Sequence, residues 1–275
     1  MKDIKNKIQA VLEVVAVFIL TLAVMGVFFT SPLGDWERQV LQRFFLTYAL
    51  MIATPLLILV LMRRNLAAYG LSLKNFKYHL DIALTCFIPY SAAMALGFAV
   101  DLGNPVFNRL LDIVIAIAVL FILARLLKSK PSLGSMVVTG IFLLYSPHPS
   151  PSAGAAIGRA VSALIYYTFF LGPGEELLFR GYIQSRLNES FDRPYHFLGA
   201  KWGWGVIITS LLFGLFHVLN LPSLYQGGVD LNWWGMTSFF WGLVFGFVRE
   251  KTGSIVAPAI LHGLPQGIAW AFLGL

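Results

Sequence analysis

The chain consists mainly of long apolar segments separated by short polar connections. Windows of roughly 17 to 25 residues, long enough to cross about 30 Å of hydrocarbon as a helix, recur along the whole length. The pattern predicts an all-α polytopic membrane protein, with eight or nine transmembrane helices in one integral membrane domain. The candidate spans are residues 10–30, 41–62, 80–100, 110–127, 133–145, 155–171, 204–219, 233–248 and 255–275.

Lysine and arginine gather in short clusters at the ends of these segments. With nine spans, every cluster faces the cytoplasm under the positive-inside rule, and the N-terminus is cytoplasmic. If the short segment 133–145 is re-entrant, the alternation fails, so we expect it to span the membrane. The clusters are Lys2, Lys5 and Lys7; Arg63 and Arg64; Lys128 and Lys130; Arg186, Arg193 and Lys201; Arg249 and Lys251.

Composition agrees with a multi-pass protein of the cell membrane. The chain is 58% hydrophobic and 12% charged, whereas about 25% of a soluble domain is charged. The net charge of +7 lies at segment ends and not on one face, which argues against nucleic acid as a partner. The first apolar segment follows three lysines as a secretory signal does, but its length favours a retained helix.

A proline-rich connection divides the chain into two parts. Residues 146–154 contain Ser-Pro-His-Pro-Ser-Pro, which cannot continue a helix because proline removes a backbone donor. We expect residues 1–150 to form transmembrane helices that act as scaffold and control substrate access, and residues 151–275 to carry the catalytic helices. No repeat links the two parts, so nothing supports a transporter built from inverted repeats.

Two adjacent carboxylates, Glu175 and Glu176, follow Gly172-Pro173-Gly174 in an apolar region, and Arg180 comes four residues after Glu176. Charged groups at membrane depth are costly, which indicates a functional site. Acidic residues also suit a helix N-terminus, but this structural account explains one carboxylate better than two. Glu176 and Arg180 share a helix face and are expected to pair, whereas Glu175 points about 100° away.

Two histidines, His217 and His262, lie deep in apolar segments. A single histidine in a membrane helix often makes only a hydrogen bond between helices. Two of them together with the glutamate pair favour a catalytic site. The other histidines, His79, His148 and His196, fall in or beside predicted connections and are expected at the surface.

Three short motifs follow one another in the second part of the chain. Glu175, Glu176 and Arg180 form EExxxR, Phe213 and His217 form FxxxH, and His262 begins a third motif in which Gln266 stands four residues later. Residues 164–267 resemble the CPBP (or Abi) family of intramembrane proteases, which includes the type II CAAX prenyl endopeptidases. That family usually has Asn or Asp at the position of Gln266.

The resemblance implies an intramembrane endopeptidase that hydrolyses a peptide bond near the cytoplasmic membrane face. Amide hydrolysis requires an activated water and a donor for the oxyanion. Glu175 is the expected general base and His217 positions the water, while His262 and the Gln266 amide stabilise the oxyanion. Glu176 and Arg180 support the site. The expected substrate is a membrane-associated peptide or protein, prenylated or not, and no oligomer is required.

A catalytic zinc is an alternative, because Glu175, His217 and His262 are ligand types that zinc accepts. The sequence has no HExxH pair, however, and we favour a glutamate-activated water without a cofactor. GxSxG and GxGD motifs are also absent. Two other functions stay open: a non-catalytic immunity or peptide-binding protein of the same fold, and a proton-coupled transporter.

Overall fold

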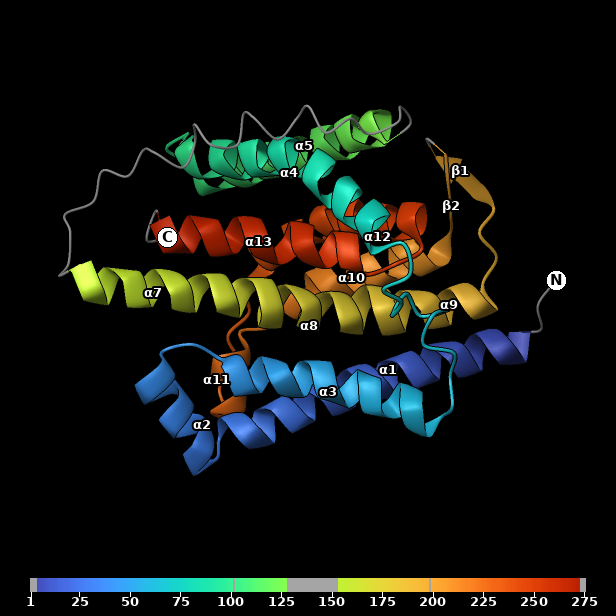
Figure 1. The fold of residues 1–275 in the computed structure, drawn as a ribbon. Helices are drawn as coiled ribbons and strands as arrows, with labels where there is room; N and C mark the ends of the chain where they lie inside the picture. Colours follow the sequence, from blue (N-terminus) through green and yellow to red (C-terminus); the bar gives the residue numbers. More distant parts are fainter. Residues whose placement is uncertain (1–3, 101, 128–152, 198, 273–275) are drawn as a thin grey trace.

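The computed structural model describes residues 4–100, 102–127, 153–197 and 199–272. Most of the long helices run roughly along one common axis, and the two chain ends lie at opposite ends of it (Figure 1). A long helix crosses the middle, with α1 (Ile4–Phe29) and α3 (Phe45–Leu61) on one side. The other side holds α4 (Phe76–Ala99), α5 (Pro105–Leu126), α10 (Trp204–Val218), α12 (Ser238–Thr252) and α13 (Val256–Phe272).

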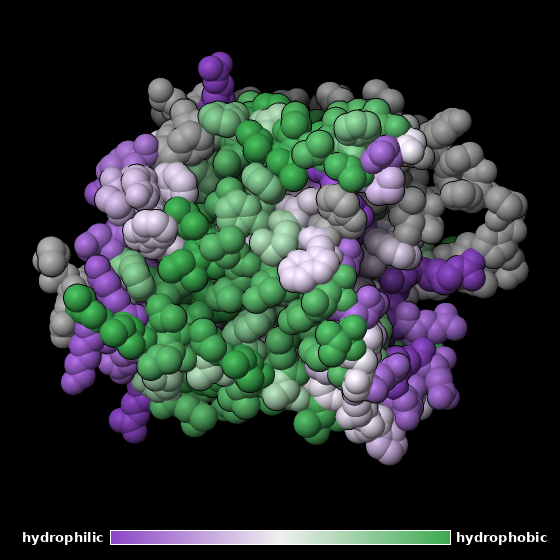
Figure 2. Space-filling view, turned by 180° about the vertical axis from the view of Figure 1, so that it is seen from behind, coloured by the Kyte–Doolittle hydropathy of each residue, from purple (hydrophilic) through white to green (hydrophobic). Residues whose placement is uncertain are grey.

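Length and composition allow three of these helices, α1, α4 and α5, to cross a membrane, and α3 and α10 are shorter apolar helices. Figure 2 shows an apolar band across the middle of one face, with hydrophilic residues gathered at both ends. Apolar side chains on α1 such as Leu12 and Val27 are 64% and 74% exposed, as expected for contact with lipid. The chain is a helical membrane protein.

Several sequence predictions concern residues outside this description. The predicted fifth span, residues 133–145, most of the proline-rich connection, His148, and the lysines at 128 and 130 all lie there. The number of spans, eight or nine, therefore stays a prediction. The all-helical prediction missed one short hairpin of β1 (Tyr195–Phe197) and β2 (Ala200–Trp202).

The long helix is continuous from α7 (Ala153–Ile165) through η3 (Tyr166–Leu171), α8 (Gly172–Glu176) and η4 (Leu177–Ile183) to α9 (Gln184–Ser190). The residues at its four junctions all have right-handed helical dihedrals, and η3 and η4 are π-helical. Such wider turns are frequent at functional sites. The predicted span 155–171 ends too early: the helix continues through Gly172-Pro173-Gly174, because the π-helical turn before Pro173 accommodates its missing backbone donor.

This continuity changes the surroundings of the carboxylates. Glu175 and Glu176 lie near the middle of the long helix, far from the first turn in which a helix dipole stabilises acidic residues. The dipole therefore does not explain them, and their partners must come from other helices.

Two glycines allow α13 to cross the long helix with the backbones in contact. A Cβ added to Gly172 would lie 2.8 Å from the backbone N and Cα of Gly263. One added to Gly263 would lie 2.1 Å from the carbonyl oxygen of Tyr167. Small residues permit such close approach between membrane helices. The crossing brings His262, the neighbour of Gly263, to the level of Glu176.

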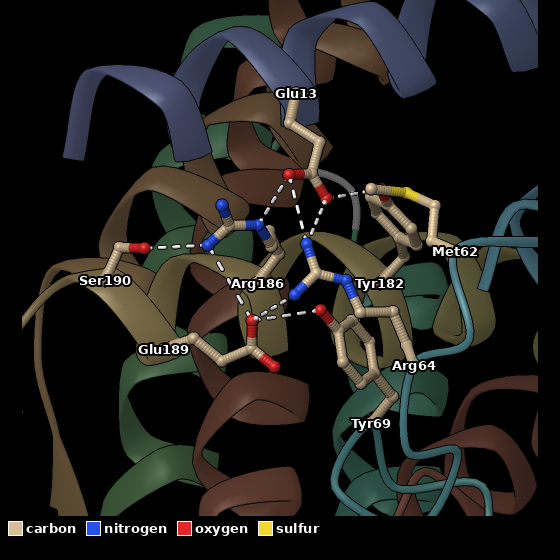
Figure 3. Close-up of polar contacts among 8 residues, drawn as sticks. All are labelled: Glu13, Met62, Arg64, Tyr69, Tyr182, Arg186, Glu189 and Ser190. Atoms are coloured by element: carbon tan, nitrogen blue, oxygen red, sulfur yellow. Dashed lines mark hydrogen bonds and ion pairs between the residues drawn. The ribbon is translucent and has the colours of Figure 1, made fainter. Parts of the chain in front are cut away.

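A cluster of charged and hydroxyl side chains joins α1, α9 and the connection after α3 (Figure 3). We refer to it as the Glu13 cluster. Its members are Glu13, Arg64, Tyr69, Tyr182, Arg186, Glu189 and Ser190.

Glu13 is the centre of this cluster. Its carboxylate accepts hydrogen bonds from Arg186 Nε at 2.8 Å, Tyr182 Oη at 2.9 Å and Arg64 Nη2 at 3.3 Å. Glu13 lies near the start of the predicted span 10–30, where a carboxylate can extend to the membrane surface, but only 13% of its side chain is exposed. Burial raises the pKa of the nearby Tyr69 hydroxyl, which stays protonated and donates to Glu189. The cluster fastens α1 to the end of the long helix.

The glycine crossing leads to a prediction about stability. Gly263→Ala should destabilise the protein by at least about 1–3 kcal/mol, because the added methyl group meets backbone that cannot move aside. Gly158→Ala is the matched control, since an added Cβ there meets nothing within 4 Å, and it should be neutral or slightly stabilising. Thermal unfolding midpoints in one detergent compare the two. Equal midpoints for Gly263→Ala and the unchanged protein would contradict the close crossing.

Candidate active site

The structure brings together the charged residues that the sequence singled out. Glu175 and Glu176 come from α8, and Arg180 follows one turn later in η4. His217 lies in the last turn of α10, and His262 lies in the middle of α13. Four of these five residues are buried, with exposed fractions of 3% or less; the exception is His217, whose side chain is 32% exposed.

Glu176 is the centre of a buried polar network. Its Oε1 atom accepts hydrogen bonds from Arg180 Nη1 at 2.8 Å and from His262 Nδ1 at 2.9 Å. Arg180 also donates through Nη2 to the carbonyl oxygen of Gly242 in α12, at 3.1 Å. Its guanidinium lies 4.3 Å from the ring centre of Phe213 in α10, a favourable cation–π contact. The predicted pair of Glu176 and Arg180 therefore links four helices.

Glu175 has a different set of neighbours. Its Oε1 atom accepts a hydrogen bond from Tyr48 Oη at 3.1 Å. Its Oε2 atom lies 3.7 Å from His262 Nε2 and 3.9 Å from His217 Nε2, beyond hydrogen-bond distance. Oε2 is buried and has no hydrogen-bond partner among the described residues. Since buried carboxylate oxygens are normally paired, this atom is suited to hold a water molecule or a polar group of a ligand.

Backbone and carboxylate acceptors fix how the two imidazoles are turned. His217 Nδ1 lies 2.8 Å from the carbonyl oxygen of Phe213, and a carbonyl can only accept, so Nδ1 carries the proton. His262 Nδ1 donates to Glu176 in the same way. Both rings therefore direct Nε2 toward Oε2 of Glu175. In the neutral form, each Nε2 is a hydrogen-bond acceptor.

Aromatic rings enclose these imidazoles. The ring of Phe245 in α12 stacks on His262, with centres 4.7 Å apart and an angle of 17° between planes. The ring centre of Phe213 lies 4.5 Å from that of His217. Phe213 thus has three roles in the FxxxH motif, because it also contacts Arg180 and its carbonyl accepts from His217. The apolar surroundings lower the local dielectric and strengthen the polar contacts.

Two cavities, of about 490 and 340 Å³, meet at the histidines. His217, His262 and Gln266 line both of them. Glu175 and Tyr48 line the smaller cavity, together with the segment 219–222 that follows α10. The larger one extends between α4, α5, α12 and α13. A peptide that occupied both cavities would pass directly over Glu175 and the two imidazoles.

Gln266 lies one turn beyond His262, as the third motif predicts. Pro265 precedes it, yet α13 continues through both residues to Phe272. The Gln266 side chain is partly buried and borders both cavities. Its amide is therefore close to the groups that the sequence assigned to catalysis.

The fit of a zinc ion depends on Glu175, His217 and His262. These residues are ligand types that catalytic zinc takes. In the part of the chain that the structure describes, however, no group of three His, Cys, Asp or Glu side chains is arranged to hold a metal ion.

Sequence reasoning missed Tyr48. This tyrosine lies in the first turn of α3, inside an apolar segment without any motif, and only the packing of α3 against α8 brings its hydroxyl to Glu175. The prediction that His79 lies at the surface is also wrong: it is 5% exposed and its Nε2 lies 3.1 Å from the carbonyl oxygen of Lys74. His196 is exposed, as predicted.

The same part of the chain matches a known family. Residues 157–267 match the family model described as type II CAAX prenyl endopeptidase Rce1-like. This segment is similar to the Rce1-like family. All three motifs, from Glu175 to Gln266, lie inside the matched range, and the match supports a protease at the coarse level. No curated protein and no solved structure matches the chain.

The buried ion pair leads to a second prediction. Arg180→Met should destabilise the protein by about 3–5 kcal/mol, because it leaves the Glu176 carboxylate buried without its main partner. The double variant Arg180→Met with Glu176→Gln should recover part of this loss. The free energy of unfolding of the single and the double variant is measured in detergent.

Asp35→Asn is the control for this experiment. It removes one member of the Asp35–Arg38 pair, in which the Asp35 side chain is 57% exposed, and should change stability by no more than about 1 kcal/mol. If Arg180→Met cost no more than this control, the network would not be the structural centre of the site.

Proposed function

We propose that the protein is an intramembrane endopeptidase in which Glu175 activates a water molecule for attack on a peptide bond. The convergence of Glu175 Oε2 and two imidazole Nε2 atoms carries this proposal. Gaps of 3.7 and 3.9 Å are too long for direct hydrogen bonds, but one bridging water can span them. The family match to residues 157–267 supports the same class of reaction.

The proposed reaction follows from these positions. Glu175 takes a proton from the water while the water oxygen bonds to the carbonyl carbon of the peptide. The carbonyl oxygen becomes an oxyanion. When the C–N bond breaks, the proton on Glu175 passes to the amine nitrogen that leaves. Tyr48, which donates to the other oxygen of Glu175, holds the carboxylate with Oε2 toward the histidines.

Gln266 supplies the donor for the oxyanion in this proposal. Its side-chain NH₂ group can donate, and it borders the cavities next to His262. His262 joins as a donor only when both of its ring nitrogens carry protons, since Nδ1 already donates to Glu176. In its neutral form its Nε2 can only accept, so it is an alternative to His217 as the acceptor for the water proton that Glu175 does not take. Glu176 and Arg180 support the site by fixing His262.

The first part of the chain contributes more than a scaffold. Tyr48 of α3 reaches Glu175, and α4 and α5 line the larger cavity. We propose that these helices guide a membrane-associated peptide, prenylated or not, to the carboxylate. The proposal requires no oligomer.

The proposed chemistry requires no metal ion, because one carboxylate and two imidazoles suffice to hold a water. Catalytic zinc is the alternative. Metal analysis of active purified protein separates the two: one stoichiometric zinc, lost together with activity in a His217 or Glu175 variant, would establish the alternative.

Glu175→Gln tests the proposed base. The variant keeps the size and the acceptor for Tyr48 but cannot take a proton, so hydrolysis of membrane-associated peptides should fall by about 10²–10⁴-fold. The assay uses purified protein in lipid with prenylated and unprenylated peptides. Glu189→Gln, on the same long helix but outside the site, should keep the activity of the unchanged protein.

Equal hydrolysis by Glu175→Gln and the unchanged protein would contradict the proposed mechanism. A Glu175→Gln protein that still binds peptide and performs its cellular function would instead identify a non-catalytic peptide-binding protein of the same fold.

Gln266 offers a separate test of oxyanion stabilisation. Gln266→Ala should lower kcat by about 10²–10³-fold, the usual effect of losing one such donor, and should change KM little because the interaction forms in the transition state. Gln266→Asn keeps an amide and should retain more activity than Gln266→Ala. An unchanged kcat in Gln266→Ala would show that this amide has no role in the transition state.

A further inference from the structure

The two cavities extend from the histidines toward the same end of the helix bundle. In the smaller cavity, Tyr48 belongs to the first turn of α3, and residues 219–222 follow the end of α10. In the larger cavity, Arg109 lies near the start of α5 and Trp270 near the end of α13. We call this end of the bundle the cavity end.

The way from Glu175 to the other end is filled by side chains. Arg180 and Phe179 follow on the long helix and are 0% exposed, as is Tyr182. Tyr182 already belongs to the Glu13 cluster, in which ion pairs join α1, α9 and the connection after α3 (Figure 3). Both cavities therefore extend toward the cavity end, whereas packed side chains fill the space between Glu175 and the opposite end.

The end with the Glu13 cluster is also rich in cations, so we call it the basic end. It contains the N-terminus, the connection from α3 to α4, the hairpin and the connection from α12 to α13 (Figure 1). Among the described residues, the cations of the cavity end are fewer: Arg38 and Arg43 in the connection from α1 to α3, Arg109 near the start of α5 and Arg159 in α7. The described cations of the basic end are Lys5, Lys7, Arg63, Arg64, Lys74, Lys77, Arg186, Arg193, Lys201, Arg249 and Lys251.

The positive-inside rule places the basic end in the cytoplasm. We propose that the site opens to the non-cytoplasmic side of the membrane, and that its substrate is a peptide segment exposed on that side. This inference rests on the proposed peptidase function. It differs from the expectation of cleavage near the cytoplasmic face, and it makes a C-terminus prenylated in the cytoplasm a poor substrate.

The proposal can be tested by cysteine labelling. The single cysteine, Cys86, is buried, so a Cys86→Ala background is suitable for added cysteines. Val229→Cys at the cavity end and Leu73→Cys at the basic end form a matched pair, since the native side chains are 80% and 75% exposed. Pro222→Cys is placed on the border of the smaller cavity.

A membrane-impermeant maleimide is added to spheroplasts that carry each variant in a bacterial plasma membrane. Val229→Cys and Pro222→Cys should be labelled on intact spheroplasts, whereas Leu73→Cys should be labelled only after permeabilisation. A bulky maleimide on Pro222→Cys should also cause loss of peptide hydrolysis, while the same label on Val229→Cys leaves it unchanged.

The opposite labelling pattern, with Leu73→Cys labelled from outside and Pro222→Cys only after permeabilisation, would overturn the proposal. Undiminished hydrolysis by protein labelled at Pro222→Cys would overturn the proposal that the peptide reaches the site through the smaller cavity. If the unlabelled variants hydrolyse no peptide but show the expected labelling, the proposed function fails while the side on which the site opens is confirmed.

Discussion

The structure of the site depends on one constraint, the cost of burying the charge of Glu176. A buried carboxylate persists only when its charge is compensated, and here Arg180 and His262 both donate to the Oε1 atom, while Oε2 has no hydrogen-bond partner among the described residues. Because Arg180 also bonds to the backbone of α12, satisfying this charge fixes the long helix, α12 and α13 relative to one another. The glycine contact between Gly172 and Gly263 lets the backbones approach closely enough for this network to form.

The same network separates the roles of the two carboxylates. Glu176 is occupied on its Oε1 atom by two donors, whereas Glu175 keeps one buried oxygen directed at two imidazole nitrogens. His262 belongs to both groups, since its Nδ1 donates to Glu176 and its Nε2 faces Glu175. The structural pair thus orients a residue of the proposed reactive centre, which is the arrangement that preorganised acid–base catalysis requires.

The sequence predicted the charged and imidazole residues of the site because apolar surroundings make them conspicuous, and helical spacing predicted the pair of Glu176 and Arg180. It did not predict Tyr48, since a tyrosine in an apolar segment is ordinary until another helix packs beside it. The glycines and proline at 172–174 suggested that the helix ends there, but it continues through them with π-helical turns on either side. Glu13 resembled a surface residue because its cationic partners come from segments distant in the chain.

The central claim is that Glu175 activates a water held between it and the two histidines. The most direct measurement is an experimental structure with a bound peptide in which a phosphinate replaces the scissile amide, since such analogues imitate the transition state. The account predicts one phosphinate oxygen at hydrogen-bond distance from Glu175 Oε2 and the other beside Gln266, with the peptide in the two cavities. A phosphinate bound elsewhere, or beyond the reach of Glu175, would contradict it.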